Sequence, residues 1–68
     1  MLTTERRNRI REIIELNGSV KVSDLAEAFS VSRMTIRRDL LALSASGFID
    51  RTHGGAMAVN DGFGTMEQ

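Results

Sequence analysis

The sequence predicts a mainly α-helical domain that ends in a small β-hairpin, and three observations lead to this prediction. Apolar residues recur at helical spacing in three segments, with a hydroxyl side chain or a glycine at their ends. A glycine pair at residues 54–55 separates two short runs that favour extended backbone. The chain has 68 residues and is 41% hydrophobic, which suits one small domain with one core.

The first predicted helix covers residues 3–17. We expect it to begin at Thr3 or Thr4 with a threonine hydroxyl as its cap. Glu5 stands in the first turn, where the helix dipole favours an acid. Gly18 ends the helix, because glycine adopts the left-handed C-terminal conformation without strain.

A short strand and a second helix follow. Residues 19–22 alternate polar and apolar side chains, which predicts a strand. We expect Ser23 to cap a helix from Asp24 to Phe29. Residues 30–32 are too few for anything but a tight turn into the next helix.

The third helix begins after its predicted cap, Ser32, and continues until Gly47 stops it. Two helices joined by about three residues, the second of them basic, form a helix-turn-helix, here at about residues 20–39.

Residues 48–52 and 56–59 are predicted strands around a turn at residues 53–55. A hairpin in this place, at about residues 48–59, is the wing of a winged helix-turn-helix, and the strand at residues 20–22 joins it. The predicted fold is thus three helices and a wing on one core, made of Ile10, Ile13, Ile14, Val20, Val22, Leu25, Phe29, Val31, Ile36, Leu40, Leu43 and Ile49.

Projection of the third helix at 100° per residue separates a core face from an outward face. With Ile36 at zero, Leu40 lies at about 40° and faces the core. Met34 at about 160°, Arg38 at about 200° and Thr35 at about 260° point away from it.

Two residues stand on the flank of this helix. Arg37, at about 100°, can swing to a DNA phosphate. Leu41, at about 140°, is exposed by this projection, and we expect it to pack against the wing or a neighbouring element rather than contact a base.

The net charge is zero, but the positive charge is concentrated. Residues 33–53 contain four arginines and two aspartates, and residues 5–15 contain four arginines and three glutamates. Residues 19–30 and 54–68 are net acidic. A charge run is often only a solvated face, but here the basic residues stand on the helix and hairpin that a duplex would meet.

The outward residues have the chemistry of a DNA interface. Arginine contacts guanine O6 and N7 or grips phosphate, and threonine and methionine offer methyl contacts to thymine. We therefore expect double-stranded DNA as the partner. The predicted DNA-binding residues are Ser32, Arg33, Met34, Thr35, Arg37, Arg38, Arg51, His53 and Gly54.

The wing leaves two alternatives open. Strand alternation puts Arg51 on the same face as Ile49, so Arg51 either extends past the sheet edge to phosphate or pairs with an acid such as Asp39. Gly54 and Gly55 allow positive φ and a close approach to phosphate.

Other classes of function are disfavoured. His53 is the only histidine and there is no cysteine, so we expect no metal, no cofactor, no disulfide and no enzymatic activity. No apolar run has membrane-spanning length, and the N-terminus lacks the apolar core of a signal peptide, which predicts a soluble cytoplasmic protein. A protein-association module is the competing hypothesis, and only Met34 and Leu41 favour it.

Several of these residues together resemble the DeoR family of bacterial transcriptional repressors over about residues 2–59. The resemblance rests on Arg6, Ile10, Ile14, the run Ser32-x-x-Thr35-Ile36-Arg37-Arg38-Asp39-Leu40, Gly47, Arg51 and His53-Gly54-Gly55-Ala56. It implies that residues 1–59 form a DNA-binding domain. It also implies that a larger domain, similar to sugar-phosphate isomerases, follows in the family and binds a phosphorylated metabolite.

The resemblance also sets expectations beyond this domain. Residues 60–68 are small and polar and suit a linker toward an effector domain, so we expect part of a longer repressor rather than a naturally short regulator. Because no long apolar stripe is left over once the core is assigned, we expect the isolated domain to be monomeric, and copies to pair on DNA or through a dimeric or tetrameric full-length protein. Such a regulator is cytoplasmic and associates with the bacterial nucleoid when bound to DNA.

Overall fold

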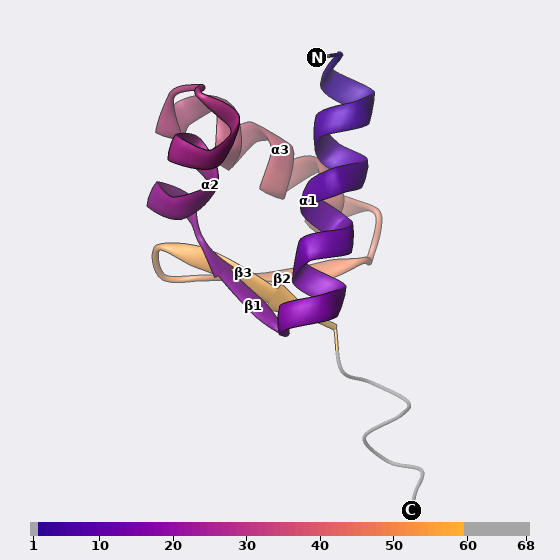
Figure 1. Cartoon of the computed structure of the whole chain (residues 1–68). Helices are drawn as coiled ribbons and strands as arrows, with labels where there is room; N and C mark the ends of the chain where they lie inside the picture. Colours follow the sequence, from indigo (N-terminus) through magenta and orange to yellow (C-terminus); the bar gives the residue numbers. More distant parts are fainter. Residues whose placement is uncertain (1, 60–68) are drawn as a thin grey trace, which may run out of the picture.

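The computed structural model describes residues 2–59, so the predicted linker at residues 60–68 lies outside the described residues. Three helices lie on one side of a small three-stranded sheet (Figure 1), which confirms the predicted winged helix-turn-helix. The elements are α1 (Thr3–Asn17), β1 (Ser19–Lys21), α2 (Val22–Phe29), α3 (Arg33–Ala45), β2 (Ile49–Thr52) and β3 (Gly55–Ala58).

The N-terminus of α1 differs from the prediction in its cap. The helix begins at Thr3, but Leu2 is the capping residue and no side-chain hydroxyl caps it. Instead, the Leu2 backbone N–H donates to the Glu5 carboxylate at 3.1 Å. A carboxylate in the first turn can reach back in this way and also meets the positive end of the helix dipole. The C-terminus is as predicted, with Gly18 at φ +87°.

The boundary between β1 and α2 also differs from the prediction. The helix begins at Val22, two residues early, and Ser23 does not cap it. The Val22 N–H donates to the Gly54 carbonyl at 2.9 Å, so the hairpin turn supplies the acceptor that a serine was expected to provide. Val22 is consequently a buried helix residue (5% exposed) rather than the end of a strand.

The turn between α2 and α3 is as tight as predicted. Ser30 adopts the left-handed region (φ +57°), and the Val31 N–H donates to the Ala26 carbonyl at 3.0 Å. Ser32 caps α3, accepting the Thr35 N–H at 3.1 Å. The helix ends at Ala45, and Gly47 then turns the chain with φ +84°.

The sheet has the order β1-β3-β2, and both pairs are antiparallel. Gly54 takes a positive φ, as expected, but Gly55 does not. A Cβ at Gly55 would lie 2.0 Å from the Val20 carbonyl oxygen, so this glycine lets β1 approach β3. The structure therefore gives Gly55 a role in strand packing, and its approach to phosphate stays a prediction.

The core joins all three helices to the sheet. Most of its predicted members are buried, while Ile13, Val20, Phe29 and Val31 are partly buried and pack against it. Ala26 and Ala56, which were not among the predicted core residues, are also buried, and so is one unpredicted charge, Asp39, which is 0% exposed.

Candidate nucleic-acid interface

The outward face of α3 carries exposed basic side chains. Arg33, Met34, Arg37 and Arg38 are exposed, while the opposite side of the helix contributes Ile36 and its neighbours to the core. The predicted separation of the two faces is therefore confirmed. Contact of the outward residues with DNA stays a prediction.

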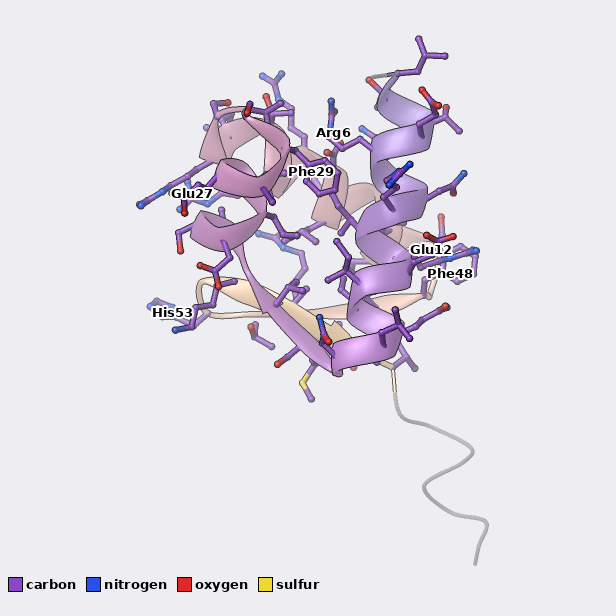
Figure 2. The ribbon with its side chains drawn as sticks, viewed as in Figure 1. Arg6, Glu12, Glu27, Phe29, Phe48 and His53 are labelled. Carbon is purple, nitrogen blue, oxygen red and sulfur yellow. The ribbon has the colours of Figure 1, made fainter. Side chains whose placement is uncertain are left out.

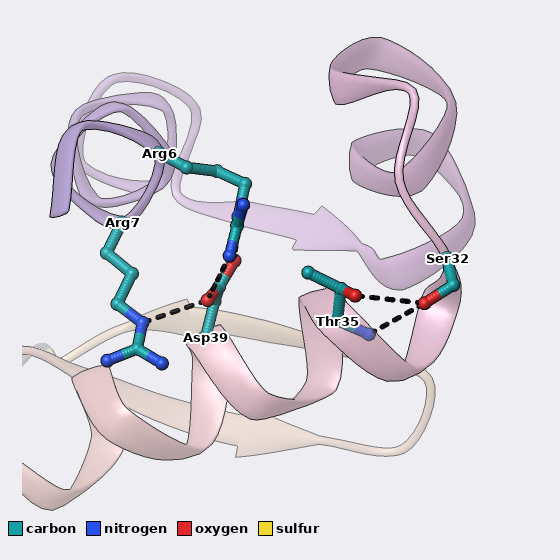
Figure 3. Close-up of polar contacts among 5 residues, drawn as sticks. All are labelled: Arg6, Arg7, Ser32, Thr35 and Asp39. Atoms are coloured by element: carbon teal, nitrogen blue, oxygen red, sulfur yellow. Dashed lines mark hydrogen bonds and ion pairs between the residues drawn. The ribbon is translucent and has the colours of Figure 1, made fainter. Parts of the chain in front are cut away.

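The N-terminal turn of α3 is held by two hydroxyls. The Ser32 and Thr35 hydroxyl oxygens lie 3.0 Å apart, beside the capping bond from the Thr35 N–H (Figure 3). Only one of the two hydroxyl protons is used between them, so the other can be donated to a phosphate or a base. Ser32 is exposed and Thr35 is half-buried, which places this donor at the rim of the helix face.

The hairpin turn stands beside α3 and adds further basic groups. Arg37, Arg51 and His53 line one groove of about 270 Å³ between α3 and the turn, with Gly54 on its wall. Figure 2 shows His53 at the tip of the hairpin, at the other end of the sheet from Phe48. The structure thus brings the predicted helix flank and the predicted wing residues together.

One of the two alternatives for Arg51 is wrong. Asp39 does not pair with Arg51, because its carboxylate faces α1 and accepts hydrogen bonds from Arg6 and Arg7 (Figure 3). Arg51 is exposed, and within residues 2–59 no acid lies close enough to form an ion pair with it. The phosphate alternative remains a prediction.

The cluster of Asp39, Arg6 and Arg7 links α1 to α3. Arg6 donates from both Nε and Nη2, the latter at 3.1 Å, and Arg7 donates from Nε at 2.8 Å. Burial raises the pKa of the Asp39 carboxyl, but the hydrogen bonds and charges of the two arginines outweigh burial and hold this pKa below its usual value. Asp39 is therefore a buried, ionised anchor between two helices.

A sequence signal for this cluster existed. Arg6 stands four residues before Ile10, on the apolar stripe of α1, and Asp39 lies three residues after Ile36 and four before Leu43 on α3. A charge on each of two core-facing stripes, with opposite signs, indicates a buried ion pair.

Two large apolar side chains of α3 are exposed. Met34 and Leu41 are each 55% exposed. The projection therefore placed Leu41 correctly on the exposed side of the helix, and its packing against the wing or a neighbouring element stays a prediction. Both side chains are available at the surface to a duplex or to another partner.

The arginines predicted to contact DNA are not paired with acids in the described part of the chain. Among residues 2–59, Arg33, Arg37, Arg38 and Arg51 form no ion pair. The same part of the chain contains no group of three His, Cys, Asp or Glu side chains that could hold a metal. None of its helices has the length and apolar character that crossing a membrane requires.

Comparison with known proteins shows the family to which the chain belongs. Residues 6–61 match the DeoR-like helix-turn-helix domain. The chain is 44% identical over 59 residues to an uncharacterized HTH-type transcriptional regulator of Bacillus subtilis, covering 87% of this chain and 23% of the relative. No solved structure matches.

Two relatives from Escherichia coli K12 have more specific names. A putative galactitol utilization operon repressor is 44% identical over 62 residues, covering 91% of this chain and 55% of the relative. The glycerol-3-phosphate regulon repressor is 48% identical over 56 residues, covering 82% of this chain and 22% of the relative. The chain therefore spans between about a fifth and about half of the length of these relatives.

Proposed function

Because the chain belongs to the family of DeoR-like helix-turn-helix domains, we propose that it binds double-stranded DNA through α3 and the wing and so represses transcription. The observation that carries this proposal is a set of four exposed arginines that have no ion-pair partner within residues 2–59. Three of them are on α3 and the fourth is on the adjacent wing: Arg33, Arg37, Arg38 and Arg51. A helix with its side chains is about 10–12 Å wide, and the major groove is about 12 Å wide.

The outward residues divide into two roles. Arg38 and Met34 lie near the centre of the outward face and would meet base edges. Arg37 and Arg51 line the groove beside the hairpin turn and would meet backbone phosphates, with His53 and the Gly54 backbone at the tip of the wing. Phosphate contacts hold the helix in place, and base contacts select the sequence.

The pathway and the effector are inferred from relatives. The names of the two Escherichia coli relatives refer to galactitol utilization and to glycerol 3-phosphate, so we propose an operon for carbohydrate or polyol use as the target. A sugar-phosphate-type effector would be bound by a domain outside this chain. Such a repressor acts in the cytoplasm without catalysing a reaction.

The first experiment identifies the operator and separates the two roles. Duplexes that bind the protein are selected from a random pool, and Arg37→Ala and Arg38→Ala are titrated against the selected duplex and a random one. Arg37→Ala should weaken binding to both duplexes equally. Arg38→Ala should lose an additional 1–3 kcal/mol, roughly, on the selected duplex. Equal losses on both duplexes for both variants would show that Arg38 does not contact a base.

A second candidate function rests on Met34 and Leu41. Their exposure on one face of α3 would suit a module that binds another protein. That function predicts no duplex enriched from the pool, and it predicts that alanine at Arg37 or Arg38 changes nothing.

A further inference from the structure

We infer that Arg7 of α1 is a DNA phosphate contact, held in place for that purpose by Asp39. This inference rests on the proposed function, because it extends the interface from α3 and the wing to a third element. In this arrangement the wing contacts the DNA backbone on one side of α3, and α1 contacts the backbone on the other side.

The two arginines around Asp39 are bound unequally. Arg6 forms two hydrogen bonds to the carboxylate, through Nε and Nη2, and its side chain is 12% exposed. Arg7 forms one, from Nε to Oδ1 at 2.8 Å, and its side chain is 36% exposed. Arg6 is therefore the buried partner, and Arg7 is bound at the surface by one edge.

The charges in the cluster do not balance. Two guanidinium groups share a single carboxylate, so the cluster has a net charge of plus one. Arg6 alone already donates to both oxygens of this carboxylate. Within residues 2–59, the hydrogen bond of Arg7 goes to Asp39 alone. Figure 3 shows its two terminal nitrogens on the side away from the carboxylate. This leaves a fork of N–H donors that matches the geometry of a phosphate.

The position of Arg7 around α3 suits the second strand. With Ile36 at zero, Asp39 lies at about 300° and Arg37 at about 100°, so the two flank the outward face on opposite sides. Arg37 stands beside the wing turn, and Arg7 stands beside Asp39. A helix in the major groove has a phosphate backbone on each side. Arg37, which stands on the wing side of α3, and Arg7 therefore contact different DNA strands.

The hydrogen bond to Asp39 also prepares Arg7 for this contact. A free arginine loses much side-chain freedom when it grips a phosphate, but Arg7 is already held at Nε. Asp39 is thus a positioning residue and does not itself meet DNA, because its side chain is 0% exposed.

The test compares Arg7→Ala with Arg9→Ala. Arg9 is an exposed arginine on α1, about 160° around the helix axis from Arg7. Its replacement removes the same charge from a different face of the helix and is therefore the matched control. Affinity for a selected and a random duplex is measured between about 50 and 200 mM salt. Arg7→Ala should reduce affinity for both duplexes equally, by roughly tenfold near 0.1 M salt, and make the log–log salt slope shallower by about 0.9. Arg9→Ala should leave the slope unchanged.

A second variant separates charge from folding. Arg7→Gln can still donate an N–H to Asp39 but carries no charge, so it should show the same change in slope while keeping the helical circular dichroism of the parent. An unchanged slope in folded Arg7→Gln would overturn the inference, as would equal changes for Arg7→Ala and Arg9→Ala. In both cases the parent would still bind DNA with a steep salt slope. If the parent itself binds no duplex, it is the proposed function that fails.

Discussion

Replacement of Asp39 by asparagine is the most informative perturbation of the fold. The carboxylate is fully buried and accepts three hydrogen bonds from two guanidinium groups. Asp39→Asn keeps the shape and one acceptor oxygen but removes the charge, which leaves the largely buried Arg6 guanidinium without its counter-ion. Breaking a buried pair in this way destabilises proteins by about 3–5 kcal/mol.

That loss is large for a domain of this size. About 60 residues confer a free energy of unfolding of roughly 3–9 kcal/mol. Because asparagine retains one acceptor, we expect a loss near the lower limit, about 3 kcal/mol. Each kcal/mol shifts the Tm of such a small domain by about 4–8 °C, so the Tm should fall by at least about 12 °C.

Urea denaturation followed by helical circular dichroism measures the effect. Asp50→Asn is the matched control, since Asp50 is an exposed aspartate on β2, and it should change the stability by less than about 0.5 kcal/mol. The double variant Arg6→Met/Asp39→Leu should recover part of the loss, because an apolar pair of similar volume can replace a buried ion pair. If Asp39→Asn unfolds at the same urea concentration as Asp50→Asn, Asp39 does not anchor α1 to α3.

Three further predictions concern acid, the sheet and the oligomer. Because the pKa of Asp39 lies below the unfolded value of about 3.9, its stabilisation is complete above about pH 5 and declines as the pH falls below about 4. The stability difference between the parent and Asp39→Asn should therefore shrink in urea titrations from pH 7 to pH 3, and a constant difference would refute this. Gly55→Ala should lower the free energy of unfolding by about 1–3 kcal/mol, because the added Cβ would lie 2.0 Å from the Val20 carbonyl oxygen. An unchanged urea midpoint would show that β1 can move away without cost. Sedimentation without DNA should show a monomer at all concentrations. A tight dimer at micromolar concentration would instead place a dimer interface in this domain, and the exposed Leu41 would be the first residue to test.

The fold was predictable wherever local signals determine it. The apolar stripes of the helices, the Ser32 cap and the glycine stops all act within a few residues, and the structure has them as predicted. The start of α2 was not predictable in this way. Its first N–H bonds to the Gly54 carbonyl, more than thirty residues away in the sequence, so the nearby Ser23 is not needed as a cap.

The candidate site was predictable residue by residue but not as an assembly. Helical projection identifies the exposed residues of α3, yet it says nothing about which elements stand on either side. That Arg51 lines the same groove as Arg37 and does not pair with Asp39 depends on how the hairpin folds back, and that Asp39 pairs with Arg6 depends on how α1 packs. Pairing between helices far apart in sequence has no local signal beyond a charge on an apolar stripe.

The salt dependence of duplex binding by the parent protein tests the central claim most directly. Fluorescence anisotropy with a labelled duplex would give Kd between about 50 and 200 mM salt. Contacts from Arg7, Arg37 and Arg51 to one phosphate each predict that log affinity falls linearly with log salt, with a slope of about −2.7. Binding that does not change with salt, or no binding to any duplex at the low end of this range, would contradict the account.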